Sequence, residues 1–145
     1  MTNMKLSINF AKAFRRAMAL KPNLRLTHVN LERNELRDKG SIAIAKALAT
    51  SPCIIALNLA SNEIKPAGVN KIFELFLPNQ SLLEMRLGTE DGGNVNRANV
   101  SLAPVLSKFV KENSFLAIVS LRGMGLTLDC LRDVFENLRE SFQLN

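Results

Sequence analysis

The spacing of apolar side chains changes in the same way several times along the chain. Apolar residues first alternate with polar ones, in the pairs Val29 and Leu31, Leu57 and Leu59, Met85 and Leu87, and Val119 and Leu121. They then recur every three or four residues, at Ile44, Ala47 and Leu48, at Ile72, Leu75 and Phe76, at Leu106, Phe109 and Val110, and at Val134 and Leu138. A period of two is typical of a strand with one buried face, and a period near 3.6 of a helix. The pattern therefore predicts four units, each a short strand followed by a helix.

The first two units align residue by residue at a displacement of 28 positions. Leu26 and Asn34 of one correspond to Ile54 and Asn62 of the other, and the third copy begins at Leu82 after the same displacement. A fourth copy begins at Leu116, after a longer step of 34 positions. One such unit cannot bury its apolar face alone, so neighbouring units must stack and share a core. We expect a short curved solenoid with parallel strands inside and helices outside.

The pattern LxxLxLxxNxL with this period resembles the leucine-rich repeat, in its long ribonuclease-inhibitor-like class. The resemblance implies an α/β fold, a right-handed horseshoe arc with about four parallel strands on the concave side and about five helices on the convex side. We expect a single domain over residues 1–145, with an N-terminal half-repeat or cap helix in residues 1–25 and repeats at residues 26–53, 54–81, 82–115 and 116–145.

The N-terminal segment, residues 1–25, carries all of the net charge. It holds six Lys or Arg and no acid, and the rest of the chain has 13 residues of each sign. Ala13 and Phe14 begin a stretch that mirrors the helix beginning at Ala43, which favours a helix over residues 8–20 above the alternative of a mitochondrial transit peptide. This helix is either a polar cap of the solenoid or a docking element for an acidic partner. The absence of Trp and Tyr argues against nucleic-acid binding.

Residues at the ends of the strands have structural interpretations. We expect the amides of Asn34 and Asn62 to bond main-chain groups where the chain leaves the sheet. Asp38 is a candidate helix cap, Pro66 fits a first helical turn, and Gly40 and Gly68 fit positions where backbones approach closely. In the third and fourth copies Glu90 and Met124 align with these asparagines, so the ladder of amides is expected to stop after two repeats.

The third copy contains six extra residues, which we place before its helix, in residues 88–100. Ser101 as N-cap puts Pro104 in the first turn, where proline is tolerated. Two interpretations of this polar, glycine-rich segment stay open, a functional loop and a tolerated insertion.

Residues 81–113 support a narrower resemblance. The apolar and charged pattern of residues 81–87, a long polar loop, and a helix ending at Asn113 are similar to a late repeat of the tropomodulin and leiomodin C-terminal domains. The resemblance implies an actin-binding surface, since these proteins cap or nucleate filaments at the pointed end. The continuation through Gly123 and Leu126 departs from that family, and no residue role is carried over.

The sequence offers little catalytic chemistry. His28 has no partner that would make a triad or a metal site. Cys53 and Cys130 lie about two repeats apart, too far for a disulfide, and are expected to be small buried residues. Residues 88–93 lack the Lys-Ser/Thr ending of a phosphate loop, and the acidic pair Glu90-Asp91 cannot ligate calcium alone. We therefore expect no enzyme, no cofactor and no metal site.

Composition fits a cytoplasmic protein. A chain of 145 residues with 47% apolar residues suits one core, and two cysteines fit a reducing compartment. No apolar run approaches the ~20 residues that span a bilayer, and the first ten residues do not resemble a secretory signal.

Strand residues that do not point inward should form the concave surface. The candidate partner-binding residues are His28, Asn30, Ile55, Asn58, Leu83, Glu84, Arg86, Ile118, Ser120 and Arg122. Glu32, Arg33, Ala60, Ser61, Gly88, Thr89 and Gly123 are expected on the same surface. One edge is apolar, through Ile55, Ala56, Leu83, Ala117 and Ile118. This edge is either a protein interface or is covered by a loop or a neighbouring repeat.

The favoured hypothesis is a non-catalytic scaffold that binds a partner protein through the concave face. The alternatives are an actin pointed-end regulator of the tropomodulin or leiomodin type, a Ran GTPase-activating-like regulator, and a fragment of a larger repeat protein.

Overall fold

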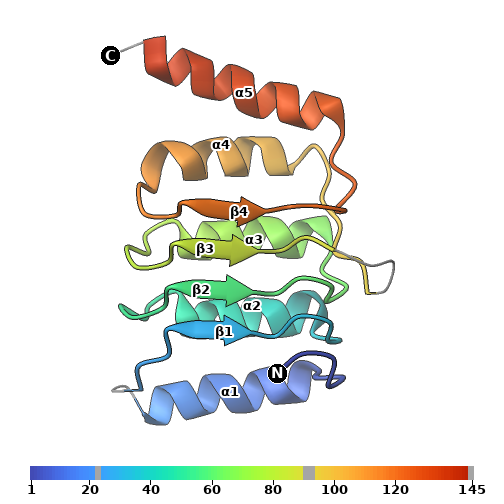
Figure 1. The fold of residues 1–145 in the computed structure, drawn as a ribbon, viewed down its shortest axis with the longest axis vertical. Coiled ribbons are helices and arrows are strands. Elements are labelled where there is room, and N and C mark those ends of the chain that lie inside the picture. Colours follow the sequence, from blue (N-terminus) through green and yellow to red (C-terminus); the bar gives the residue numbers. More distant parts are fainter. Residues whose placement is uncertain (22–23, 90–93, 144–145) are drawn as a thin grey trace.

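The computed structural model describes residues 1–21, 24–89 and 94–143. Helices and strands alternate strictly along the chain (Figure 1). Their bounds are α1 Ile8–Leu20, β1 His28–Asn30, α2 Arg37–Leu48, β2 Ala56–Asn58, α3 Pro66–Phe76, β3 Glu84–Arg86, α4 Leu102–Glu112, β4 Ile118–Ser120 and α5 Leu128–Gln143. The predicted alternation of strand and helix is confirmed, as is the helix predicted over residues 8–20.

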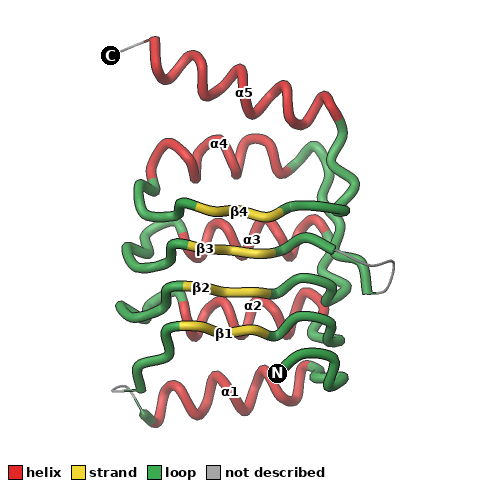
Figure 2. The backbone as a smooth tube through the Cα atoms, in the orientation of Figure 1, coloured by secondary structure: helices red, strands yellow, loops and turns green. Residues whose placement is uncertain are grey.

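The strands form one parallel sheet in the order β1-β2-β3-β4. Its register aligns Val29 with Leu57, Leu57 with Met85, and Met85 with Val119. The register continues past the strands, since the Leu31 N–H donates to the Asn58 carbonyl and the Leu87 N–H to the Ser120 carbonyl. Figure 2 shows the strands side by side on one side of the chain and the helices behind them. The expected α/β solenoid is confirmed.

One continuous apolar core lies between the sheet and the helices. Leu57 and Leu59 from β2 and its following turn are buried, as are Ile44 and Ile72 from the helices behind them. In the last repeat the equivalent side chains Val119 and Leu121 are only half-buried, because the sheet ends at β4. Burial is therefore complete in the middle of the stack and decreases toward its C-terminal end.

Helix α1 closes the other end of the stack. Ala11 is fully buried, and Phe10, Phe14 and Met18 pack against the core from the same face of the helix. A Cβ at Gly40 would lie 3.1 Å from the Leu36 Cβ at the start of α2 and 3.7 Å from the Ala11 Cβ of α1, so this glycine lies where α1 packs on α2. The helix buries its apolar face and leaves its basic residues in solvent.

The ladder of buried amides extends over three repeats. Asn62 donates through Nδ2 to the Leu31 and Leu59 carbonyls, which join the first repeat to the second. Asn96 repeats this arrangement with the Leu59 and Leu87 carbonyls, and its Oδ1 accepts from the Asn62 and Ile64 N–H groups. The prediction that the ladder stops after two repeats was therefore wrong.

Asn96 is the third asparagine of this ladder, because the six-residue insertion precedes it. The step from Asn62 to Asn96 is 34 positions instead of 28, so an alignment without the insertion selects Glu90. Glu90 to Gly93, which include the predicted acidic pair, lie outside the described residues. In the fourth copy the aligned residue is Met124, which is buried.

A second ladder, which the sequence analysis missed, lies where the helices lead into the strands. The Asn79 amide donates to the Ala49 and Ser51 carbonyls, and the Asn113 amide donates to the Asn79 carbonyl. Each side chain also accepts main-chain N–H bonds at the start of the following strand segment, such as that of Leu82 for Asn79 and Leu116 for Asn113. The two ladders hold both ends of every strand in the central repeats.

Two helix starts differ in detail from the expectation. Asp38 does not cap its own helix, because its Oδ1 accepts the Lys65 N–H of the next repeat at 2.7 Å. Gly68 makes room for this bond, since a Cβ there would lie 2.5 Å from Asp38 Oδ1. Ser101 does precede α4, but its hydroxyl donates to Asn99 Oδ1 and does not cap the helix. Pro66 is the first residue of α3, as predicted.

Replacing Asn96 by alanine should lower the free energy of unfolding by about 2–4 kcal/mol, because the Asn62 and Ile64 N–H groups and the Leu87 carbonyl lose their side-chain partner and the Leu59 carbonyl keeps only its bond from Asn62. Urea denaturation followed by circular dichroism measures the change. Asn99→Ala is the matched control, since Asn99 is exposed and bonds only Ser101 through its side chain. Equal stability of the two variants would contradict the structural role of Asn96.

Candidate functional site on the concave strand face

The sheet arranges its outward side chains in rows that cross all four strands. One row consists of His28, Ala56, Glu84 and Ile118, and a second of Asn30, Asn58, Arg86 and Ser120. A third row, directly before the strands, consists of Thr27, Ile55, Leu83 and Ala117. The structure therefore brings nine of the ten predicted partner-binding residues together on these rows, and the tenth, Arg122, lies just beyond Ser120.

Apolar residues of the first and third rows form an exposed patch, which we call the apolar strip (Ile55, Ala56, Leu83, Ala117 and Ile118). Ile55, Leu83 and Ile118 are 37%, 46% and 55% exposed. The register places Ile55 beside Leu83, and Ile118 beside Glu84 one residue further along. Within the described part of the chain, no loop or neighbouring repeat buries these three side chains. The strip is an open surface.

The polar row next to the strip is held in place by local bonds. Asn30 and Asn58 accept the N–H groups of the second residue after each, at 3.0 Å, and the Asn58 amide donates to Glu32 Oε2 at 3.2 Å. The Arg86 guanidinium forms an ion pair with Glu84 on the same strand. These contacts fix the border of the strip and leave it close to neutral.

The concave face is shorter than the sequence predicted. Ala60, Ser61, Gly88 and Thr89 were expected on it, but all four are buried. The turns after the strands stack too closely to leave these residues open, with the Thr89 N–H donating to the Arg122 carbonyl. A Cβ at Gly88 would lie 2.7 Å from the Arg122 carbonyl oxygen. Arg122 itself is exposed and forms no ion pair with another described residue.

The single histidine lies at the exposed edge strand. His28 Nδ1 is 3.1 Å from Thr27 Oγ1, and the ring borders a shallow hollow of about 220 Å³ over β1 to β3. Among the described residues, no three His, Cys, Asp or Glu side chains are grouped to hold a metal ion. The residues around the hollow can contact a side chain of a partner, and they do not form a catalytic arrangement.

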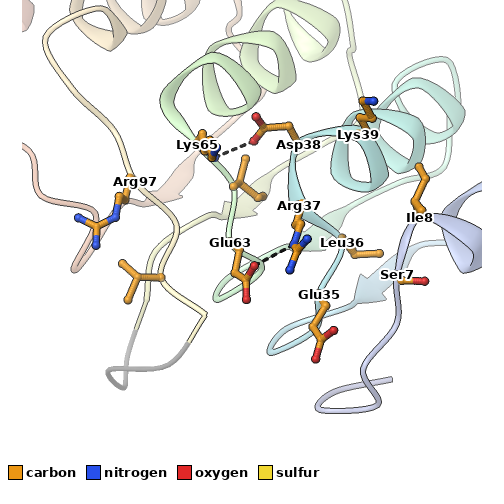
Figure 3. Close-up of a pocket in the computed structure, with 12 residues that line it drawn as sticks. Ser7, Ile8, Glu35, Leu36, Arg37, Asp38, Lys39, Glu63, Lys65 and Arg97 are labelled. Atoms are coloured by element: carbon orange, nitrogen blue, oxygen red, sulfur yellow. Dashed lines mark hydrogen bonds and ion pairs between the residues drawn. The ribbon is translucent and has the colours of Figure 1, made fainter.

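A second cleft, of about 790 Å³, lies at the edge of the solenoid where α2 and α3 begin (Figure 3). Arg37 and Glu63 form an ion pair of 2.9 Å across its floor, and Lys65 bonds Asp38 through its main chain. The insertion closes one side, since the Asn94 carbonyl accepts the Glu63 N–H. The Arg37 and Asp38 contacts join the first repeat to the second, and the Asn94 contact joins the second to the third. Arg37, Asp38 and Glu63 are thus used in packing the repeats.

The basic residues of the N-terminal segment form a separate surface. Lys12, Arg15 and Arg16 of α1 are exposed, as are Lys5, Lys21 and Arg25 around it. Ion pairs within the described residues involve Arg33, Arg37, Lys71, Arg86 and Arg132, and none of these six. The charge asymmetry of the sequence is therefore present on the folded surface, at the opposite end of the stack from α5 (Figure 1).

The two cysteines are free, as expected, and differ in environment. Cys130 is buried in α5, whereas Cys53 is half-buried before β2. Burial raises the pKa of the Cys130 thiol, the charge of Asp133 adds to this rise, and a hydrogen bond with the Ala103 backbone offsets part of it. The expectation of two buried cysteines is correct only for Cys130.

No helix among the described residues combines the length and the apolar character needed to cross a membrane.

Comparisons with known proteins agree with this fold. The family described as Leucine Rich repeat matches residues 23–45 and 50–73. A solved structure titled "Leiomodin-1 Actin-Binding Site 2 (ABS2)" is similar over 98% of this chain and 80% of its own, with 22% identity and a TM-score of 0.70. The tropomodulin C-terminal domain from Caenorhabditis elegans is similar over 99% of this chain and 82% of its own, with 20% identity and a TM-score of 0.59. Among the curated proteins, none matches the sequence.

The chain therefore has a leucine-rich repeat fold. Both resemblances drawn from the sequence, to the leucine-rich repeat and to the tropomodulin and leiomodin C-terminal domain, are confirmed at the level of the fold. The local likeness around residues 81–113 extends to nearly the whole chain.

The native protein should react with a thiol reagent in two steps, first at Cys53 and then at Cys130, with rates at least roughly tenfold apart. Cys130 reacts slowly because it is buried and because its raised pKa lowers the fraction of thiolate at neutral pH. Absorbance of released thionitrobenzoate follows both steps. Cys53→Ser should leave only the slow step, and equal rates for the two thiols would contradict the assigned environments.

Proposed function

We propose that this chain is a non-catalytic scaffold that binds a partner protein on its concave face. The observation that supports this proposal is the apolar strip, where three large apolar side chains lie exposed in neighbouring positions of a rigid sheet. Contiguous exposed apolar side chains on a folded protein are typical of a contact site. The sheet needs no rearrangement to present them.

The apolar strip and the polar residues beside it would contribute to binding in different ways. Full burial of a Leu or Ile side chain gains about 1.5–3 kcal/mol, and these side chains are already half-covered, so each would contribute about 1 kcal/mol. The asparagines and the Glu84–Arg86 pair next to the strip would orient the partner through hydrogen bonds. We place Arg122 at the rim, where its unpaired charge would favour an acidic group of the partner.

The proposal of a non-catalytic role rests on the chemistry of the described surface. His28 contacts a threonine hydroxyl, and the concave hollow contains no nucleophile paired with a base. Two free cysteines are typical of a protein kept in a reducing compartment, so we propose a cytoplasmic location.

Actin is the second candidate partner. The specific observation in its favour is the similarity of nearly the whole chain to a structure whose title names an actin-binding site of leiomodin. The identity to that structure is 22%, and actin binding by this chain is the hypothesis that the sedimentation experiment below tests. In that hypothesis the chain acts as a regulator at the pointed end of the filament.

The double variant Ile55→Glu, Ile118→Glu should lose capture of proteins that the wild type retains from a cytosolic extract. Two carboxylates would have to be desolvated in the interface, and we expect a loss of affinity of at least about a hundredfold. Quantitative mass spectrometry of the captured proteins measures the difference.

Val100→Glu is the matched control for this experiment, because Val100 is an exposed apolar residue in the segment before α4, away from the strip. It should capture the same proteins as the wild type. If the double variant also captures them, the concave face is not the binding surface.

The actin hypothesis predicts that the wild-type chain sediments with actin filaments and slows elongation from their pointed ends. The double variant should do neither at the same concentration, and Val100→Glu should behave like the wild type. Failure of the wild type to act on actin would eliminate actin as the partner and would leave the capture experiment to test the scaffold.

A further inference from the structure

The two edge strands of the sheet, β1 and β4, differ in what covers their outer sides. At the N-terminal end, the chain before α1 lies along β1, with the Met1 ammonium donating to the Asn30 carbonyl and the Asn3 N–H to the Glu32 carbonyl. Asn34 holds this segment through bonds to the Met1 carbonyl and the Met4 N–H. At the C-terminal end, β4 pairs within the described residues with β3 alone.

The outer edge of β4 therefore has main-chain groups without partners among the described residues. The Ile118 N–H and the Ser120 carbonyl point toward β3, where they bond the Leu83 carbonyl and the Leu87 N–H. Because successive residues of a strand alternate, the N–H groups of Val119 and Leu121 point to the open side. Such an edge is a template for an added strand.

An apolar groove of about 570 Å³ lies next to this edge, between β4 and the last two helices. Val119 and Leu121 line it from the sheet, Arg122 from the turn after β4, Leu106 and Val110 from α4, and Leu131 from α5. The corresponding core residues of the second repeat, Leu57 and Leu59, are 1% and 0% exposed. The groove is thus the place where the next layer of the core would lie.

Helix α5 adds a second apolar face at the same end. It packs on the core through Cys130 and Val134, which are buried. Leu128, Leu131 and Phe135 lie on a different side at helical spacing, and Leu128 and Phe135 are 81% and 66% exposed. We call these three residues the α5 stripe. Figure 1 places α5 at the end of the stack beyond α4.

The charge of the edge favours a second copy of this chain as the occupant. Residues 116–121, which include β4, contain no charged side chain, whereas β3 contains Glu84 and Arg86. In a twofold arrangement each β4 pairs antiparallel with the same segment, so like residues come close to one another. A segment without charged side chains avoids the repulsion that like charges would cause there.

The area at this end also suits a dimer. Besides Ile118, whose side chain lies on the concave face, five of the exposed large apolar residues lie between positions 110 and 135, namely Val110, Phe115, Leu128, Leu131 and Phe135. The two phenylalanines alone expose roughly 200 Å², given the size of aromatic side chains. With the groove and the strand edge, the surface is a large part of the ~800 Å² per partner that a stable interface buries.

We propose that the C-terminal end of the solenoid is a homodimer interface. In it, β4 pairs antiparallel with β4 of a second copy, and the α5 stripes of the two copies pack against each other. The two four-stranded sheets become one. Ile55 and Leu83 lie on the concave face and not at this end, whereas Ile118 belongs to both regions. Ile55→Glu alone therefore tests the binding of a partner protein without altering β4, and its result is separate from that of the dimer experiment.

Sedimentation equilibrium and light scattering of the full chain over a range of concentrations test the proposal. The wild type should reach a mass of twice 16.1 kDa. Leu128→Glu, Phe135→Glu should raise the dimer dissociation constant by at least about a hundredfold, because it places like charges on facing stripes. Both positions are exposed, and circular dichroism verifies that the variant is folded.

Leu20→Glu is the matched control, since Leu20 is an exposed leucine of α1 at the opposite end of the stack, and it should dimerise like the wild type. Hydrogen exchange gives a second measurement for the strand: the Val119 and Leu121 amides should be protected in the wild type and exchange rapidly in the monomeric variant. A wild type that stays at 16.1 kDa, a larger open assembly, or a double variant as dimeric as the control would overturn the proposal.

Discussion

Buried main-chain groups are the constraint on which this fold depends. The strands are very short, so much of every repeat is turn, and a turn inside a stack leaves carbonyl and N–H groups that water cannot reach. The amides of Asn62 and Asn96 bond these main-chain groups at one end of the strands, and the amides of Asn79 and Asn113 bond them at the other end. An amide suits the position because it donates two hydrogens and also accepts, which neither a carboxylate nor a hydroxyl can do. The apolar core can form only because these groups are paired.

The sequence predicted the parts of the fold that follow from periodicity. Alternation at Val29 and Leu31, and its copies in the later repeats, identified the strands, because each inward side chain must meet its neighbour in the stack. Asn96 was missed because the insertion moved the ladder by six positions. The signal was nevertheless present, since Asn79 and Asn113 are separated by the same lengthened step as Asn62 and Asn96. Asp38 was misassigned because a cap and a bridge to the next repeat require the same residue type.

The candidate site was predicted in position but not in extent. Strand alternation is enough to place Ile55, Leu83 and Ile118 outward. Whether the concave face continues to Ala60 and Gly88 depends on how closely the turns of adjacent repeats stack, and that distance is set by contacts such as the one between Thr89 and the Arg122 backbone. A pattern within one repeat does not contain this information. The pairing of Glu84 with Arg86, which reduces the charge of the site, was likewise absent from the pattern.

A solenoid has a convex helix side, a concave strand face and two ends, and these surfaces differ in composition in this chain. The outer helices expose mainly polar and charged residues, and α1 covers the N-terminal end with its cations and Leu20 exposed. Groups of large apolar side chains are also exposed on the concave face and at the C-terminal end. The register brings Ile55, Leu83 and Ile118 together on the concave face, and Leu128 and Phe135 share one side of α5, so we assign a separate contact to each of these two groups. Ile118 is common to both regions, since it lies on β4 with its side chain on the concave face. Dimerisation through β4 would therefore set the two apolar strips next to each other, and a partner that spans them would bind two copies with greater avidity than one.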